Sequence, residues 1–254
     1  MAEVVVVRRP RISPLALLAL GLAVLSALAV VLAGLGTRWG WWRFTTGFVV
    51  LRYGFYGAGL ALLLGIVAVV RTRPGSGRRG LLVAVLALLG GGVVTGELVR
   101  WLARARSAPP IHDITTDMVD PPAFVAILPL RAQAANAAEY GGAAVAQRQQ
   151  AAYPDVQPVI LMEPPAKALA DAAAVAREMG WETVAVDSAG GRLEATATTR
   201  WFGFKDDVVV RVRPVGTGSR VDVRSVSRVG RGDVGTNARR VREFMELLKR
   251  RAGA

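Results

Sequence analysis

The 254-residue chain contains no cysteine and a single histidine, His112. These absences exclude structural disulfide bonds and the Cys-rich or multi-histidine sites that hold zinc. A chain without cysteine is compatible with oxidising and reducing compartments alike, so the cysteine content does not locate the protein. We therefore expect neither a structural metal nor a cofactor, and we turn to charge and hydropathy.

Acidic residues are almost missing from the first 106 residues, which hold 13 Arg but only Glu3 and Glu97 and so carry a net charge of +11. Residues 107–254 contribute only +2 of the total charge of +13. A nucleic-acid-binding domain needs basic groups on its globular surface to contact phosphates. Because the globular part of this chain is near neutrality, we expect no nucleic-acid partner.

Three long apolar runs fill the same acid-poor part of the chain. They are residues 14–36, without any charge; residues 47–70, with Arg52 near one end; and residues 80–99, with Glu97 near the other. One helical crossing of a bilayer needs about 20 apolar residues. The first run is longer than the core of a cleaved signal peptide, at about 7 to 15 residues, so we expect it to be retained. The sequence predicts a region of three transmembrane helices over residues 1–106, with the lipid bilayer as partner.

The basic residues beside these runs indicate an orientation, because cytoplasmic flanks are enriched in Lys and Arg. The amino-terminal flank, which includes Arg8 and Arg9, and the second loop together carry seven Arg. The first loop and the flank after the third run carry five. This bias favours a cytoplasmic amino terminus. Three crossings then place the carboxy-terminal domain in the periplasm of a bacterial inner (plasma) membrane.

Polar and aromatic residues near the ends of the runs are typical of anchoring. Trp39, Trp41 and Trp42 form part of an aromatic cluster suited to the headgroup region. Arg52 can extend toward the interface, and Glu97 and Arg100 have the i, i+3 spacing of an ion pair. The alternative, a transport role, would more often show several inward polar groups or inverted repeats.

The second half of the chain changes in character. Residues 107–157 are rich in Pro, Ala and Gln and are interpreted as an extended arm or linker; a helix within residues 131–152 is the alternative, weakened by Gly141 and Gly142. Residues 158–254 predict an α+β domain, an antiparallel sheet with two packing helices. Its expected elements are a strand at 159–162, a helix at 166–179, strands at 182–187, 192–199, 208–213 and 220–228, and a last helix capped by Thr236 or Asn237.

A distinctive string, Arg-Ser-x-Ser-Arg-x-Gly-x-x-Asp-x-Gly-x-Asn, runs from Arg224 to Asn237. Shorter strings precede it, at residues 111–117 with Pro121-Pro122, at 140–142, at 153–155 and at 204–207. Together they resemble the bacterial domain of unknown function 1499 family over about residues 109–250. The resemblance implies a domain that occurs alone or behind apolar spans, and it brings no established reaction with it.

Charged side chains alternate along the last two expected strands, and side chains two residues apart share a face. Arg211 and Arg213 on one strand and Arg224 and Arg228 on the next would then form a basic patch, with acidic residues at its edge. The start of the helix at Asn237 would add backbone N–H groups and a positive dipole end. We predict a site for an anionic lipid or glycan; the alternative is a solvent face of mutually paired ions. The predicted ligand-binding residues are Arg211, Arg213, Arg224, Arg228 and Asn237; the acids at the edge are Asp206, Asp207 and Asp222.

Candidates for catalysis are few. His112 lies beside Asp113, and Asp206 and Asp207 could act as paired carboxylates or bind Mg²⁺, although adjacent residues of a strand point to opposite faces. We therefore expect an envelope binding or scaffolding protein rather than an enzyme, with an anionic ligand or another membrane or envelope protein as partner. A membrane-anchored hydrolase that uses Asp206, Asp207 or His112 is the alternative.

Overall fold

The computed structural model describes residues 11–253 and divides the chain into two compact units. One unit extends to Ala103 and includes the short loop Trp201–Gly203; the other begins at Arg104 and contains the sheet. Arg8 and Arg9, which entered the count of flanking charges, lie outside the described residues.

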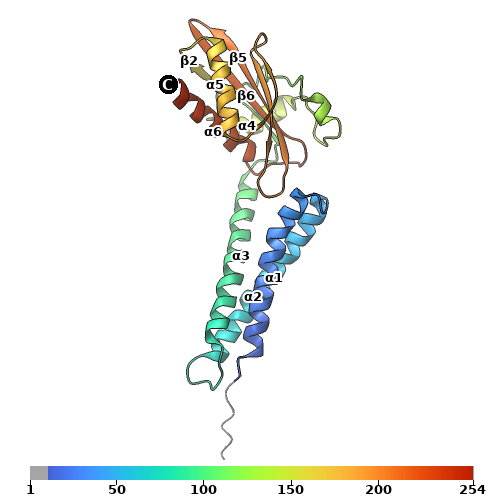
Figure 1. The fold of residues 1–254 in the computed structure, drawn as a ribbon, viewed down its shortest axis with the longest axis vertical. Helices are drawn as coiled ribbons and strands as arrows, with labels where there is room; N and C mark the ends of the chain where they lie inside the picture. The colour runs from blue at the N-terminus through green and yellow to red at the C-terminus, as the bar shows by residue number, and fades with distance from the viewer. Residues whose placement is uncertain (1–10, 254) are drawn as a thin grey trace, which may run out of the picture. The chain divides into compact units, whose positions relative to one another are not determined.

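The first unit is built from three long helices (Figure 1): α1 (Pro14–Arg38), α2 (Phe44–Thr72) and α3 (Leu81–Ser107). Each is long and apolar enough to cross a membrane, as the three apolar runs predicted. Pro14 occupies the first turn of α1, where a missing backbone N–H costs no helical hydrogen bond. Near the end of α3, Glu97 and Arg100 form the ion pair that their spacing suggested.

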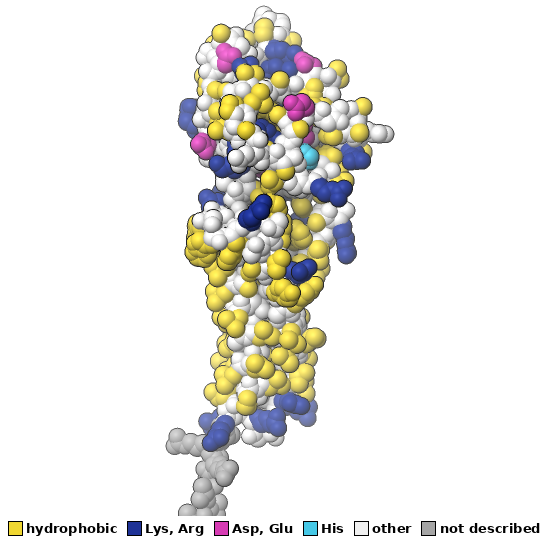
Figure 2. All heavy atoms as spheres, turned by 90° about the vertical axis from the view of Figure 1, so that its right-hand side faces the viewer, with side chains coloured by type: hydrophobic (Ala, Val, Ile, Leu, Met, Phe, Trp, Pro, Cys, Tyr) yellow, Lys and Arg dark blue, Asp and Glu magenta, His cyan; other side chains and the backbone are white. Residues whose placement is uncertain are grey.

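Small residues let these helices approach one another closely. A Cβ atom added to Gly91 on α3 would lie 2.7 Å from the backbone nitrogen of Leu62 and 2.9 Å from the carbonyl oxygen of Ala58, both on α2. Large apolar side chains such as Leu25 and Leu82 point outward instead, and hydrophobic side chains cover the surface of the helices in Figure 2. Association through small residues, with leucines outside, is typical of helices packed in lipid.

The second unit contains a sheet of six strands, all paired antiparallel, in the order β1-β6-β5-β4-β3, with β2 also paired to β6. The expected class, apolar helices followed by an α+β domain, is confirmed. The strands are β1 (Asp113–Thr115), β2 (Val159–Leu161), β3 (Glu182–Asp187), β4 (Arg192–Thr198), β5 (Lys205–Val215) and β6 (Gly218–Ser227).

Helices α5 (Pro165–Glu178) and α6 (Thr236–Ala252) pack on one face of this sheet, which we call the helix face (Figure 1). The main hydrophobic core lies between these two helices and the sheet, and it includes Val221 and Val223 of β6. The rings of Trp181 and Phe244 stack there with centroids 5.1 Å apart. Both helices were expected, α5 from the prolines at its start and Gly180 at its end, and α6 from its apolar periodicity.

The segment expected to be an arm belongs to the same unit as the sheet. It supplies β1, the 3₁₀ turn η1 (Leu128–Arg131) and helix α4 (Gly142–Ala152). The helix considered for residues 131–152 forms only from Gly142, whose φ of +68° suits glycine and breaks a longer helix. Between β1 and α4, residues 116–140 form a covering segment, and its Phe124 and Ile127 join a second small core on the other face of the sheet.

The start of α6 differs from the expectation that Thr236 or Asn237 caps it. The N-cap position is Gly235, with a φ of +74°, and neither expected side chain caps the helix. The carboxylate of Asp233 performs this function, since it accepts hydrogen bonds from the backbone nitrogens of Gly235 at 2.8 Å and Asn237 at 2.6 Å. The cap prediction was wrong because the capping side chain, Asp233, lies two residues before the N-cap position Gly235.

Candidate functional site

The charged face of the sheet lies opposite the helix face. The register sets Arg211 of β5 directly across from Asp222 of β6, and Arg213 directly across from Arg220. Like charges at directly opposed positions repel each other. The two neighbouring arginines therefore need carboxylates close by, and the covering segment provides them.

Three arginines converge at this end of the β5–β6 pair, and we call Arg211, Arg213 and Arg220 the arginine cluster. Their guanidinium groups share Asp117, whose Oδ2 lies 3.0 to 3.3 Å from a nitrogen of each. They also share Asp222, at 3.0 to 3.4 Å. A third carboxylate, Asp120, accepts from Arg211 at 3.1 Å and from Arg213 at 2.9 Å.

The three carboxylates differ sharply in exposure. The side chain of Asp222 is fully buried and that of Asp117 is 10% exposed, whereas that of Asp120 is 65% exposed. Burial acts to raise the pKa of Asp117, but backbone N–H groups of Asp120 and Val119 and the charges of Arg220 and Arg211 outweigh it and lower that pKa. Asp117 and Asp222 are thus fixed parts of the cluster, while Asp120 is its solvent-facing member.

Arg211 also has an unused donor. Its Nε atom is buried and donates no hydrogen bond, although both its terminal nitrogens are bonded. A buried N–H without an acceptor is costly. The arginine cluster therefore holds one more buried donor than its carboxylates satisfy.

Arg224 lies on the same face but is buried, with 3% of its side chain exposed. It forms a two-pronged ion pair with Asp113 of β1, at 2.9 and 2.7 Å, and donates to the carbonyl oxygens of Pro122 and Ala138. Its guanidinium also lies 5.5 Å from the ring centre of Tyr140. Arg224 therefore fastens the covering segment to the sheet.

Arg131, which is buried, and Arg228, whose side chain is 16% exposed, both pair with Asp207. Arg131 donates to Asp207 at 2.6 Å, and Arg228 donates to it at 2.9 and 2.8 Å. The Asp207 side chain is fully buried and also accepts from the hydroxyl of Thr196. Together these two cations hold η1 on the sheet, although the buried Nε of Arg131 donates no hydrogen bond.

Glu194 of β4 also holds the covering segment on the sheet. Its buried carboxylate accepts from the backbone nitrogens of Val125, Ala126 and Ile127, at 2.9 to 3.1 Å. Arg192 donates to it at 3.0 Å. A charged acceptor for three successive N–H groups fixes the turn that leads into η1.

Asn237 lies on the helix face, on the side of the sheet opposite the arginine cluster, and accepts a hydrogen bond from Arg240. Its Oδ1 accepts from the Ser225 hydroxyl at 2.7 Å, and its Nδ2 donates to the Ser227 hydroxyl at 2.9 Å and to the carbonyl oxygen of His112 at 3.0 Å. Next to it, Arg240 donates to Asp206 at 2.5 Å. The start of α6 is therefore joined to β6 by a buried polar network.

The residues considered for catalysis do not converge. Asp206 faces the helices and Asp207 faces the covering segment, so the two carboxylates lie on opposite faces of β5. The Nδ1 atom of His112 is buried and has no hydrogen-bond partner. Among residues 11–253, no three His, Asp or Glu side chains are grouped so as to hold a metal ion.

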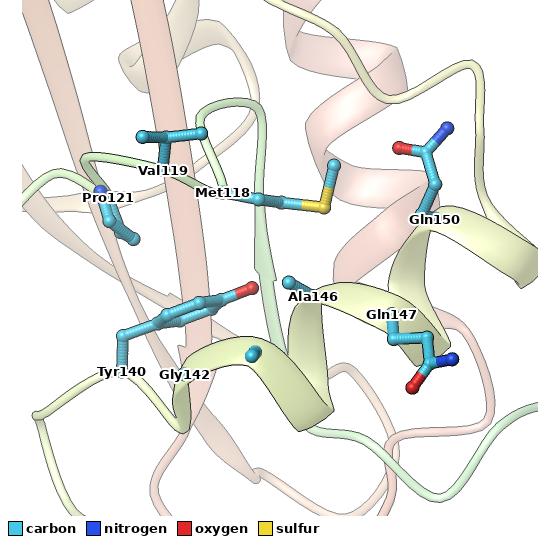
Figure 3. Close-up of a pocket in the computed structure, with 9 residues that line it drawn as sticks. Met118, Val119, Pro121, Tyr140, Gly142, Ala146, Gln147 and Gln150 are labelled. Atoms are coloured by element: carbon cyan, nitrogen blue, oxygen red, sulfur yellow. The ribbon is translucent and has the colours of Figure 1, made fainter.

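An open hollow of about 530 Å³ lies between the covering segment and α4. Its wall is mainly apolar, and no charged side chain lines it; Figure 3 shows Met118 extending toward α4 across it. The Tyr140 hydroxyl is buried, accepts and donates no hydrogen bond, and points toward Ala146 (Figure 3). The residues that line the hollow are Met118, Val119, Pro121, Tyr140, Gly142, Ala143, Ala146, Gln147 and Gln150.

Of the five residues predicted to bind a ligand, the structure brings Arg211 and Arg213 together in one cluster. Arg224 and Arg228 lie further along the same face, each with its own buried carboxylate, and Asn237 lies on the other face. Arg220, Asp117 and Asp120 were not singled out. Alternation along β6 places Arg220 on the same face as Arg224, but Arg220 was not counted among the predicted ligand-binding residues.

These observations define the class: a chain whose three apolar helices can each cross a membrane, followed by an α+β domain with an antiparallel sheet. The model of the DUF1499 family, described as proteins of unknown function, matches residues 113–248. The chain belongs to this family, as the strings around Arg224 and Asn237 indicated. No protein of curated function matches the chain.

Proposed function

We propose that this chain is an inner-membrane protein that acts as a binding or scaffolding protein of the bacterial envelope. Helices α1 to α3 would anchor it, and the count of flanking Arg supports a periplasmic position for the α+β domain. In this proposal the domain binds an anionic group, a lipid phosphate or a glycan carboxylate, at the arginine cluster.

The exposed position of Asp120 is the observation that carries this proposal. Arg211 and Arg213 each direct a terminal nitrogen at its carboxylate, and that carboxylate is 65% exposed on a loop. Guanidinium groups bind carboxylates and phosphates with the same planar arrangement of donors. An external anion can take the place of Asp120 while Asp117 and Asp222 keep the cluster assembled.

The unused donor of Arg211 supports the same assignment. Displacement of Asp120 would uncover this side of the cluster and let an anion with several oxygens reach Nε. A phosphate offers more acceptor oxygens than the carboxylate of Asp120, of which Arg211 and Arg213 share one oxygen. We assign ligand contact to Arg211, Arg213 and Arg220, and a scaffold role to Arg224, Arg228 and Asn237.

The test uses the full chain in phosphatidylcholine nanodiscs, titrated by calorimetry with glycerol 3-phosphate and, separately, with glucuronate. The first probe carries the phosphate of a lipid headgroup, and the second carries the carboxylate of an acidic glycan. We expect saturable binding of one of them. Arg213→Gln should weaken it about five- to tenfold, because a partly exposed charged hydrogen bond is lost.

Asp120→Asn provides the sharper variant, since it removes the competing charge without removing a donor from the arginines. It should tighten binding about two- to fivefold, the size expected for an exposed ion pair. The matched control is Arg242→Gln on α6, which breaks an exposed ion pair with Asp155 and should leave binding unchanged. Absence of binding, or equal affinities in Arg213→Gln and the original chain, would overturn the proposal.

A further inference from the structure

An anion bound at the arginine cluster would leave the nearby apolar hollow empty. Its wall combines Met118, Val119, Pro121 and Ala146, and its volume of about 530 Å³ falls within the range of about 300 to 1,000 Å³ typical of small-molecule sites. Val119 is 97% exposed, although a valine at a loop tip gains nothing from water. The surface is therefore suited to a hydrocarbon group.

One polar atom interrupts this apolar wall. The Tyr140 hydroxyl is buried without a hydrogen-bond partner and points into the hollow (Figure 3). The guanidinium of Arg224, 5.5 Å from the ring centre, holds the ring in place from behind. Burial raises the pKa of Tyr140 to about 12, with the charge of Asp113 adding to the effect and Arg224 opposing it, so the hydroxyl keeps its proton and remains a donor. A group that fits beside it needs an oxygen acceptor.

The hollow and the arginine cluster share one short piece of chain. Met118, Val119 and Pro121 line the hollow, while Asp120 between them pairs with Arg211 and Arg213. The backbone carbonyl of Asp120 also accepts from Arg211 at 2.8 Å. Displacement of Asp120 by an anion would therefore move the wall of the hollow, which couples the two surfaces.

We propose that the hollow binds the acyl chain of an anionic lipid whose phosphate lies at the arginine cluster, with the Tyr140 hydroxyl donating a hydrogen bond to the ester carbonyl oxygen of that chain. This inference rests on the proposed function and names its ligand class. The three surfaces match the three parts of such a lipid: an apolar wall, one neutral donor, and a group of cations that already bind a carboxylate. A membrane-anchored chain has such lipids at hand.

The experiment compares three probes on the full chain in phosphatidylcholine nanodiscs, by calorimetric titration. Glycerol 3-phosphate has only the anionic group, 1-oleoyl lysophosphatidic acid adds an acyl chain with its ester carbonyl, and the matching alkyl ether lacks the carbonyl oxygen. We expect the acyl lipid to bind most tightly, the ether next and glycerol 3-phosphate most weakly. Each methylene buried in the hollow should tighten binding about fourfold, so the acyl chain should add at least about tenfold.

Two variants locate the gain. Ala146→Trp fills the hollow and should reduce the affinity for the acyl lipid to that for glycerol 3-phosphate, while glycerol 3-phosphate itself binds as before. Its control is Ala144→Trp, an exposed position of the same helix outside the lining. Tyr140→Phe should abolish the preference for ester over ether and leave the ether affinity unchanged. Partition of the lipids into the bilayer is common to all variants and cancels in these comparisons.

The outcomes separate the two proposals. Equal affinities for glycerol 3-phosphate and the acyl lipid, or a gain that survives Ala146→Trp, would overturn the acyl-chain site and leave the anion site standing. Binding of glucuronate without any binding of glycerol 3-phosphate would have the same meaning. If no anion binds at all, the proposed function fails together with this inference. An ester preference that persists in Tyr140→Phe would remove Tyr140 from the site.

Discussion

The side chain of Gln149 bonds to both backbone groups of Thr115. Its Oε1 accepts from the Thr115 N–H at 3.0 Å, and its Nε2 donates to the Thr115 carbonyl oxygen at 2.5 Å. Thr115 ends β1, an edge strand whose free side would otherwise leave these groups unpaired. A glutamine on α4 thus closes a sheet edge and ties the helix that lines the hollow to the sheet.

This relationship predicts that Gln149→Ala destabilises the domain by about 2 to 4 kcal/mol, because two buried backbone groups lose their partners. Urea unfolding followed by circular dichroism measures the loss, and hydrogen exchange at the Thr115 amide reports it locally. Gln150→Ala, at the exposed neighbouring position, is the control and should cost little. Equal stability of the two variants would contradict the role of Gln149.

The ion pair of Arg224 and Asp113 should be essential for folding. Asp113→Asn leaves the Arg224 charge buried and only partly bonded, so we expect a loss of about 3 to 5 kcal/mol. The matched exposed pair, Arg242 and Asp155, should lose at most about 1 kcal/mol in Asp155→Asn. Thermal unfolding of the full chain measures both. A small effect of Asp113→Asn would mean that Arg224 is able to reach solvent.

Tyr140 should make the stability of the domain sensitive to alkaline pH. Its pKa is raised from 10.0 to about 12, so the folded state binds the phenolic proton more tightly than the unfolded state does. The resulting stabilisation is complete below pH 10 and is lost as the pH rises toward 12. Urea unfolding at successive pH values should show a shallower decline in Tyr140→Phe. An unchanged slope would contradict the raised pKa.

Asp233, rather than Thr236, should stabilise the start of α6. Asp233→Ala removes the acceptor for two backbone N–H groups and should cost about 1 to 2 kcal/mol. Thr236→Ala should cost less than about 0.5 kcal/mol, since its hydroxyl bonds only to the exposed Arg239 side chain. Chemical unfolding of the two variants decides between them, and the reverse order would restore the cap expected from sequence.

Gly91 should be required for the close contact of α2 and α3. In Gly91→Val, the new Cβ would meet backbone atoms of Leu62 and Ala58 at less than 3 Å, and backbone cannot yield as a side chain can. We expect a lower thermal midpoint of the chain in detergent. We also expect looser association of the two helices, measured by disulfide cross-linking between them. Gly96→Val on the same helix is the control, because nothing lies within 4 Å of its Cβ position. Equal midpoints would contradict the proposed packing.

Sequence reasoning found the apolar helices from the length of their runs, the four long strands from alternation, and the two packing helices from their boundary residues and, for α6, its apolar period. Strand alternation put Arg211 and Arg213 on one face of their strand and Arg224 and Arg228 on one face of the next; that the two faces coincide depended on the register, which the structure supplies. Run lengths, boundary residues and alternation are local properties of the chain, so they need no knowledge of its partners.

The partners of those arginines were beyond such reasoning. Asp113, Asp117 and Asp120 lie in a stretch without periodicity, and Arg224 pairs with Asp113 across a separation of 111 residues. No local pattern indicates which carboxylate will face which arginine. The hollow was missed for the same reason, because it forms only once the covering segment and α4 pack side by side. The spacing of Asp117 and Asp120 before Pro121 was the one feature of the sequence that could have indicated carboxylates near the arginines.

The pairing of β1 with β6 has a consequence for the order in which the domain is completed. Asp113 leaves the ribosome long before residues 224–226, against which its strand must be laid. Until β6 arrives, β1 has no partner strand, and the covering segment lacks the contacts of Asp117 with Arg220 and of the Pro122 carbonyl with Arg224. In the proposed topology this half-built chain crosses the membrane first, so the domain closes in a single late step, after its last strand has emerged on the far side.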